Sequence, residues 1–177
     1  MHLISCVGQR AVALIMPIKA MLAHGIISTS DDSGIHTITL LYTDSPNIRK
    51  EMEISEGWLR GNLPNAQIRK HLFQHVEDLY ERIAVTGEVS TDQRIFLSIN
   101  PGMNWEIAFL SLCVPEQTVC VATDNNRLYL WPIQDDTKDA HSYDLPDLGL
   151  DEYNELDSEI KITEKEGINE NLSNDVK

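Results

Sequence analysis

Strand-like apolar runs alternate with helical patterns along most of this sequence, and this alternation limits the fold more than any other feature. Residues 2–7 form an apolar run that ends at Gly8, and apolar positions then recur at helical spacing through 11–24. A second run, at 35–42, is rich in β-branched residues and ends in residues 43–46 (TDSP), a pattern typical of a helix start. Strands that alternate with helices predict a mainly parallel sheet covered by helices.

The middle of the chain continues the pattern with three further segments. We expect a helix over about 47–55, then an ambiguous segment at 56–64 that could hold a short edge strand around Trp58 and Leu59. A long helix is predicted over 65–84, because its apolar residues fall on one stripe: Ile68, Leu72, Val76, Leu79 and Ile83.

The last part of the pattern predicts a buried strand at 94–100, a helix at 104–113 and a hairpin formed by 118–123 and 127–133. The hairpin is expected because asparagines at 125 and 126 tolerate the positive φ of tight turns. The predicted fold class is therefore α/β, a Rossmann-like, mainly parallel sheet with helices on both faces and a C-terminal antiparallel hairpin.

Charge divides the chain into a body, residues 1–134, and a tail, residues 135–177. The tail holds 14 of the 28 acidic side chains but only 4 of the 14 basic ones, which leaves −10 on the tail and −4 on the body. We interpret 1–134 as the folded domain and 135–177 as an acidic linker or tail that leads to an absent effector domain or ends there. An acidic body is a poor candidate for non-specific binding of duplex DNA.

Cysteine usage and hydropathy point to the cytoplasm. Cys6, Cys113 and Cys120 lie in apolar surroundings without a CxxC spacing, which favours reduced, structural thiols. No apolar run approaches the roughly 18–20 residues that a membrane-spanning helix needs, so no membrane association is expected.

The candidate ligand site lies where the predicted strands lead into helices, because ligands of open α/β sheets bind at the carboxyl ends of strands. Helix N-termini there attract phosphate groups, and Arg10 is the one cationic side chain in these loops. The candidate ligand-binding residues are Gly8, Gln9, Arg10, Thr43, Asp44, Ser45, Asn100, Pro101, Gly102, Met103, Asn104 and Trp105. The alternative is that such residues merely form the turns that any α/β protein needs.

Common nucleotide-binding patterns are missing from these loops. There is no Walker sequence, and no G-x-G-x-x-G follows the first strand. We predict no cofactor, no metal and no catalytic residue. His71, His75 and Asp78 would share a face of the predicted helix 65–84, a spacing that suits a metal, but a solvated helix face is the simpler interpretation.

Three stretches together resemble the CARF domain, the CRISPR-associated Rossmann fold that senses cyclic oligoadenylates in type III CRISPR systems. They are HLISCVGQRAVALIMPIKAML (2–22), ITLLYTDSP (38–46) and IFLSINPGMNWEIAFLSL (95–112), and the resemblance covers residues 1 to about 133. The third stretch departs from the N-x-T-G-G-T-K sequence of many members. Pro101-Gly102 replaces Gly-Gly and Met103-Asn104 replaces Thr-Lys, which removes a cationic phosphate contact.

The resemblance implies a homodimeric sensor that binds cyclic tetra-adenylate or hexa-adenylate on its two-fold axis and regulates a fused or partner effector. The nearly all-apolar helix 11–24 would then form the dimer contact, the alternative being burial within one subunit. A second hypothesis is a stand-alone ring nuclease that degrades the messenger without a metal. A third is an α/β interaction domain that binds no nucleotide.

Overall fold

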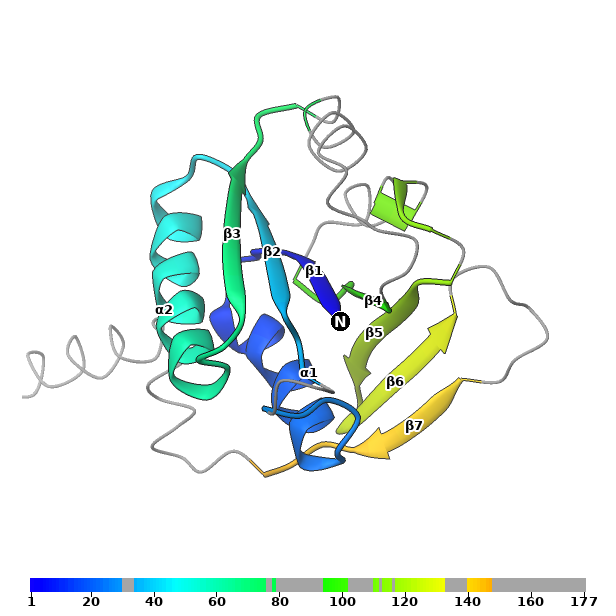
Figure 1. The fold of residues 1–177 in the computed structure, drawn as a ribbon. Coiled ribbons are helices and arrows are strands. Elements are labelled where there is room, and N and C mark those ends of the chain that lie inside the picture. The colour runs from blue at the N-terminus through cyan, green and yellow to red at the C-terminus, as the bar shows by residue number, and fades with distance from the viewer. Residues whose placement is uncertain are drawn as a thin grey trace, which may run out of the picture.

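A computed structural model describes residues 1–29, 34–75, 78, 94–101, 110–111, 113–115, 117–132 and 140–147. Its strands are β1 (His2–Cys6), β2 (Thr37–Tyr42), β3 (Gln67–Leu72), β4 (Ile95–Ser98), β5 (Val119–Asp124), β6 (Arg127–Pro132) and β7 (His141–Asp144). Its helices are α1 (Ala11–Ala23) and α2 (Pro46–Asn62). The structure is mixed α/β, as the sequence predicts (Figure 1).

One seven-stranded sheet organises the molecule, in the order β3-β2-β1-β4-β5-β6-β7 (Figure 1). β1 to β5 run parallel to one another, whereas β6 pairs antiparallel with β5, and β7 pairs antiparallel with β6. The chain builds outward from β1 to β3 and then returns to place β4 on the other side of β1. The strand order therefore reverses between β1 and β4. Open α/β sheets bind ligands at such a topological switch point.

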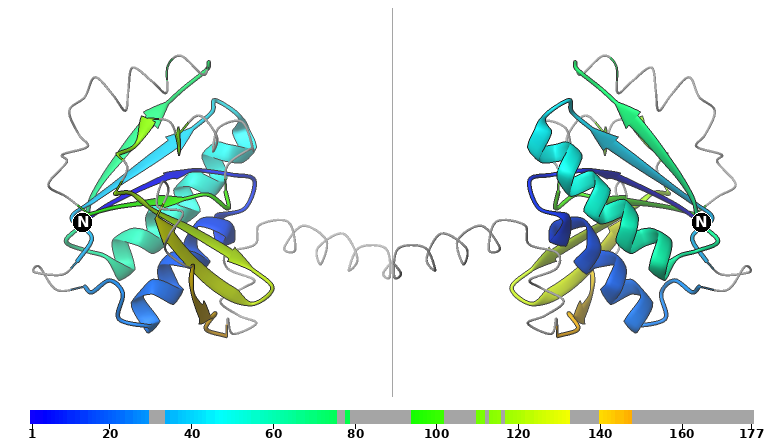
Figure 2. Two further views of the ribbon diagram at one scale, coloured as in Figure 1. Left: turned by 90° about the vertical axis from the view of Figure 1, so that its right-hand side faces the viewer. Right: turned by 90° about the vertical axis from the view of Figure 1, so that its left-hand side faces the viewer.

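Alternating side chains of the central strands form two apolar clusters, one on each face of the sheet. Leu3, Ile38 and Phe96 belong to the first cluster, which is completed by α1 and α2. These two helices lie side by side on that face (Figure 2), because right-handed crossovers that move in one direction put their helices on one side. The second cluster contains Ile4 and Leu97 and packs against Leu110 and Val114. Leu110, Ser111 and Cys113 are helical.

α1 matches the predicted helix 11–24 closely, although Pro17 lies inside it. Seven of its residues are buried, among them Leu14, Ile18 and Met21, so burial within the subunit accounts for most of its apolar surface. Gly25, with φ of 65°, follows the helix in the left-handed conformation that ends many helices.

The predicted helix 65–84 is wrong in its first part, because Gln67–Leu72 form β3. Ile68 and Leu72 are four residues apart, a spacing that places them on one face of a helix or on one face of a strand. Six register pairs with β2, from Thr37–Gln67 to Tyr42–Leu72, select the strand. His71 therefore lies on a strand, so the helical His71–His75 spacing considered for a metal does not exist.

α2 is longer than predicted and continues through residues 56–62. The edge strand considered around Trp58 and Leu59 is therefore wrong. Leu59 is fully buried one and two turns beyond Ser55 and Met52, so the segment contributes to the same apolar helix face. The sheet edge that such a strand would have occupied is formed by β3.

The C-terminal hairpin is confirmed. Asn125 and Asn126 have φ of 47° and 63° and join β5 to β6, as their tolerance of the left-handed region predicts. One more strand, β7, pairs with β6 and extends the sheet into the range 135–177 expected to form a tail. The His24 ring bonds the carbonyl oxygen of Asp144 at 2.7 Å, which ties β7 to the end of α1.

A charged cluster links β3 to α2. The Glu56 carboxylate accepts hydrogen bonds from Lys70 Nζ at 2.7 Å and Arg60 Nη2 at 2.6 Å, and these bonds lower the pKa of Glu56. Because the lowered pKa stabilises the fold only while the group is ionised, the contribution is present above the ordinary value of 4.5 and is lost as the pH falls through the folded value.

We therefore expect Glu56→Gln to lower the free energy of unfolding by about 0.5–1 kcal/mol at neutral pH. The difference from the unmodified protein should shrink toward zero below pH 4.5. Urea unfolding followed by circular dichroism at both pH values measures it. Glu53→Gln, on an exposed position of the same helix, is the control, and an E56Q deficit that persists in acid would contradict the assignment.

Candidate functional site

A pocket of about 530 Å³ opens at the carboxyl ends of β1, β2 and β4. This volume lies within the range of about 300–1,000 Å³ typical of small-molecule sites. The loop after β1, the loop after β2 and the loop after β4 all contribute to it, as do the first turns of α1 and α2. The lining residues are Val7, Gly8, Gln9, Arg10, Ala13, Thr43, Ser45, Ile48, Asn100 and Pro101.

The structure brings together most of the residues predicted for the site. Those that line the pocket are Gly8, Gln9, Arg10, Thr43, Ser45, Asn100 and Pro101. Asp44 does not line it and forms an ion pair with Arg49 instead. Gly102, Met103, Asn104 and Trp105 lie outside the described residues.

Val7, Ala13 and Ile48 also line the pocket and were not predicted. Ala13 is the third residue of α1, and Ile48 is the third residue of α2. Both therefore lie in the first turn of a helix, close to the strand ends. The predicted helices already placed both residues near a helix start, but the apolar side chains of the two residues indicated a place in the core.

Gly8 allows the loops after β1 and β4 to touch. A Cβ atom at Gly8 would overlap the carbonyl oxygen of Pro101 and would lie 2.9 Å from its carbonyl carbon. Pro101 is itself buried, so it has little room to move away. The glycine is therefore required by contact between two loops of the protein.

Asn100 holds the loop after β4 against β5. Its side-chain Nδ2 donates to the carbonyl oxygen of Thr123 at 2.7 Å, and its Oδ1 accepts from the Thr123 amide at 2.6 Å. This pair continues the β4–β5 ladder beyond the end of β4, next to the bond from the Ile99 amide to the carbonyl of Val121. Both ends of the Asn100 amide thus position the pocket wall.

Glu51 reaches the start of α1 from α2. Its Oε2 accepts a hydrogen bond of 2.7 Å from the Ala11 amide, and only 4% of the residue is exposed. The N-cap residue of α1, Arg10, provides no side-chain cap of its own. The sequence analysis missed Glu51, because forty residues separate it from its partner and nothing in its local pattern distinguishes it from a surface glutamate.

The pocket offers neutral donors and one cation. Gln9, Thr43 and Ser45 carry amide or hydroxyl groups, and Arg10 is the one cationic side chain among the described lining residues. None of these lining residues is acidic, although the Glu51 carboxylate bonds Ala11, the residue after Arg10. Such a set suits a ligand that accepts hydrogen bonds and carries limited negative charge.

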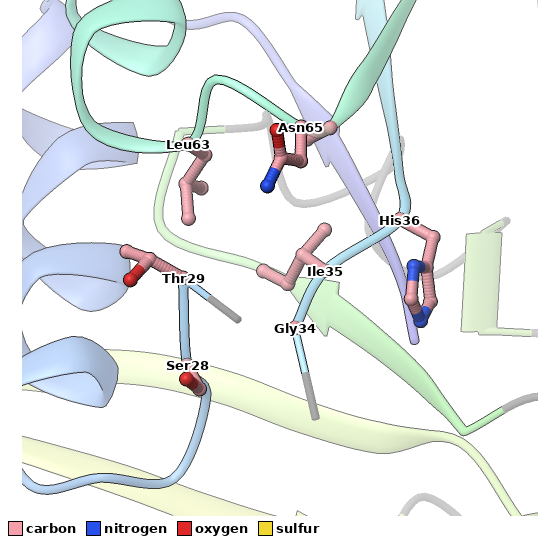
Figure 3. A pocket seen from close by; sticks show the side chains of 8 residues that line it. Ser28, Thr29, Gly34, Ile35, His36, Leu63 and Asn65 are labelled. Carbon is pink, nitrogen blue, oxygen red and sulfur yellow. The ribbon is translucent and has the colours of Figure 1, made fainter. Parts of the chain in front are cut away.

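A second hollow lies at the other end of the sheet, around Ile35, Leu63 and Asn65 (Figure 3). Its volume is about 10 Å³, which is at the lower limit for one water molecule. It is too small for a substrate, so the pocket at the strand ends is the better candidate.

The described residues contain no group of three or more His, Cys, Asp or Glu side chains arranged to hold a metal ion. None of the three cysteines forms a disulfide. Burial raises the pKa of the Cys113 thiol, and it raises that of Cys120 to about 11, so neither thiol is poised to act as a nucleophile. Within the described part of the chain, no helix has the length and apolar character needed to cross a bilayer.

The fold is similar to that of a type III CRISPR defence DNA nuclease activated by cyclic oligoadenylate. The TM-score is 0.55 at 18% sequence identity, and the match covers 82% of this chain but 21% of the nuclease chain. At this identity the similarity establishes a shared fold. The sequence matches no protein-family model, and no curated protein matches it.

Proposed function

We propose that this chain is a CARF-like sensor domain that binds a cyclic oligoadenylate and regulates an attached or partner effector. The observation that carries the proposal is the pocket at the β1–β4 reversal, lined by the three loops in which the sequence resembles CARF domains. The structural neighbour is described as a nuclease activated by cyclic oligoadenylate, which supports this ligand class.

A homodimer is part of the proposal. A ring of four or six nucleotides has repeated contacts, and a two-fold axis supplies each protein contact twice. Ala13 and Met16 are apolar, partly exposed and on one face of α1, and Ala13 also lines the pocket. Pairing of this face with a second copy would bring two pockets together, so one ring per two protomers is the expected stoichiometry.

Titration calorimetry with cyclic tri-, tetra- and hexa-adenylate tests the proposal. We expect binding of the tetramer or the hexamer at a ratio of one ring to two chains. Chromatography of the same mixtures after incubation distinguishes a sensor, which leaves the ring intact, from a ring nuclease, which yields linear products. No detectable affinity for any ring size would reject the proposal and favour an interaction domain that binds no nucleotide.

Arg10 is expected to supply the cationic contact to phosphate. Arg10→Ala should weaken binding of the cyclic adenylate by about 10- to 150-fold, because a hydrogen bond to a charged group contributes about 1.5–3 kcal/mol. Lys50→Ala removes the same charge from an exposed position of α2 that does not line the pocket, and it should leave the affinity nearly unchanged. Equal affinities of the two variants would remove Arg10 from the site.

A further inference from the structure

Glu51 is the one acidic side chain among the buried residues of the described part of the chain. Its carboxylate is bonded to the Ala11 amide, at the first residue of α1. Ile48, one turn earlier on α2, lines the pocket, and so does Arg10, directly before Ala11. A buried carboxylate is therefore held next to residues that line the pocket, although it does not line the pocket itself.

This position has an electrostatic consequence. The N-terminus of a helix carries a partial positive charge and unpaired amides, both of which attract anions. At α1 the protein's own carboxylate takes up part of that attraction. A phosphate in the pocket is then repelled by Glu51, and because Glu51 is buried this repulsion is screened less than between charges at an open surface. The repulsion grows with the charge on the phosphate.

We propose that Glu51 is a specificity-determining residue that makes this pocket favour phosphodiesters over terminal phosphates. A phosphodiester carries one negative charge, whereas a phosphate monoester carries nearly two above its second pKa of about 6. Glu51 also positions the loop after β1, because it holds the amide of Ala11. The inference rests on the proposed function, since it explains how a pocket selects a closed ring over its linear product with a free phosphate end.

The test compares AMP with its phosphate methyl ester, a diester of nearly the same size, at pH 8. The unmodified protein is expected to bind the ester more tightly. Glu51→Gln keeps a hydrogen-bond acceptor for Ala11 but removes the charge. We expect it to tighten ester binding by about 3-fold and AMP binding by about 10-fold, because the repulsion acts once per ligand charge. Calorimetry or competition against a fluorescent adenylate measures both.

Glu53→Gln is the matched control, since it removes the same charge from an exposed position two residues away on α2. It should change both affinities by less than about 2-fold, as expected for an exposed, screened charge. A purely structural role for Glu51 predicts that E51Q changes the two affinities by the same factor, and this result would overturn the inference. Absence of binding of either nucleotide to both the unmodified protein and E51Q would also overturn it.

The outcome is separable from that of the proposed function. If no cyclic adenylate binds but E51Q still shifts AMP more than its ester, the ligand class is wrong and the role of Glu51 stands. If cyclic adenylates bind but E51Q changes the affinities for AMP and for its ester by the same factor, the ligand class stands and the proposed role of Glu51 is wrong. Hydrogen exchange of the Ala11 amide provides a measurement that needs no variant, because the buried bond to Glu51 predicts slow exchange. Fast exchange in the unmodified protein would overturn the inference.

Discussion

Replacing Gly8 with alanine is expected to destabilise the protein and to distort the candidate pocket. The new methyl group would overlap the carbonyl oxygen of Pro101 and would lie 3.1 Å from its Cα atom. Because these are backbone atoms of a buried residue, they cannot swing aside as the end of a flexible side chain could. Such overpacking typically costs about 1–3 kcal/mol. Urea unfolding measures the loss, and calorimetry with cyclic adenylates should show weaker binding.

Gly57→Ala is the matched control for this substitution. Gly57 lies within α2, and a Cβ atom there would meet nothing within 4 Å. Alanine is the better helix former, so this change should stabilise the protein by about 0.5–1 kcal/mol. The same chemical change is thus expected to have opposite signs at the two glycines. A G8A protein as stable as the unmodified one would mean that the loops after β1 and β4 are not in contact.

Asn100→Ala is expected to release the loop after β4. The change removes both hydrogen bonds to Thr123 and leaves the amide and carbonyl of Thr123 without these partners. Each such bond contributes about 0.5–1.5 kcal/mol, and a partly buried group left unpaired adds a desolvation cost, so a loss of about 2–3 kcal/mol is expected. Faster hydrogen exchange at the Thr123 amide would locate the effect.

Thr123→Ala distinguishes the contribution of the Thr123 side chain from that of the Thr123 backbone. Asn100 bonds only the main-chain atoms of Thr123, so this variant retains both bonds. Its free energy of unfolding should differ from that of the unmodified protein by less than about 1 kcal/mol, the span of strand propensities. If both variants lose the same stability, the loss at Asn100 does not arise from the paired amide.

The position of the candidate site could be predicted from the sequence because it depends on local signals. Gly8, Thr43, Ser45 and Asn100 follow apolar runs and precede helical patterns, and the ends of parallel strands meet at one edge of a sheet. The reasons for individual residues were less accessible. Gly8 packs against Pro101, and Asn100 bonds Thr123. Neither contact can be predicted from the residues next to it in the sequence.

The identity of β3 could not be predicted for a related reason. Residues 67–72 carry an apolar spacing that a helix and a strand share, and no strongly β-forming run distinguishes them. Without β3, one edge of β2 would be unpaired, and pairing with that edge decides the conformation of residues 67–72. Glu51 is the same case at the level of a single side chain, because its role exists only where α2 packs on α1.

The amino-acid sequence alone determined the α/β class, the parallel arrangement of the first strands, the closing hairpin and the three loops that carry the candidate ligand residues. These features follow from periodicity and turn chemistry, which act over a few neighbouring residues. The tertiary structure alone decided which strands are neighbours, and therefore that the loops after β1 and β4 meet where the strand order reverses. It also decided that a carboxylate forty residues away bonds the first residue of α1, because packing between distant segments has no local signature.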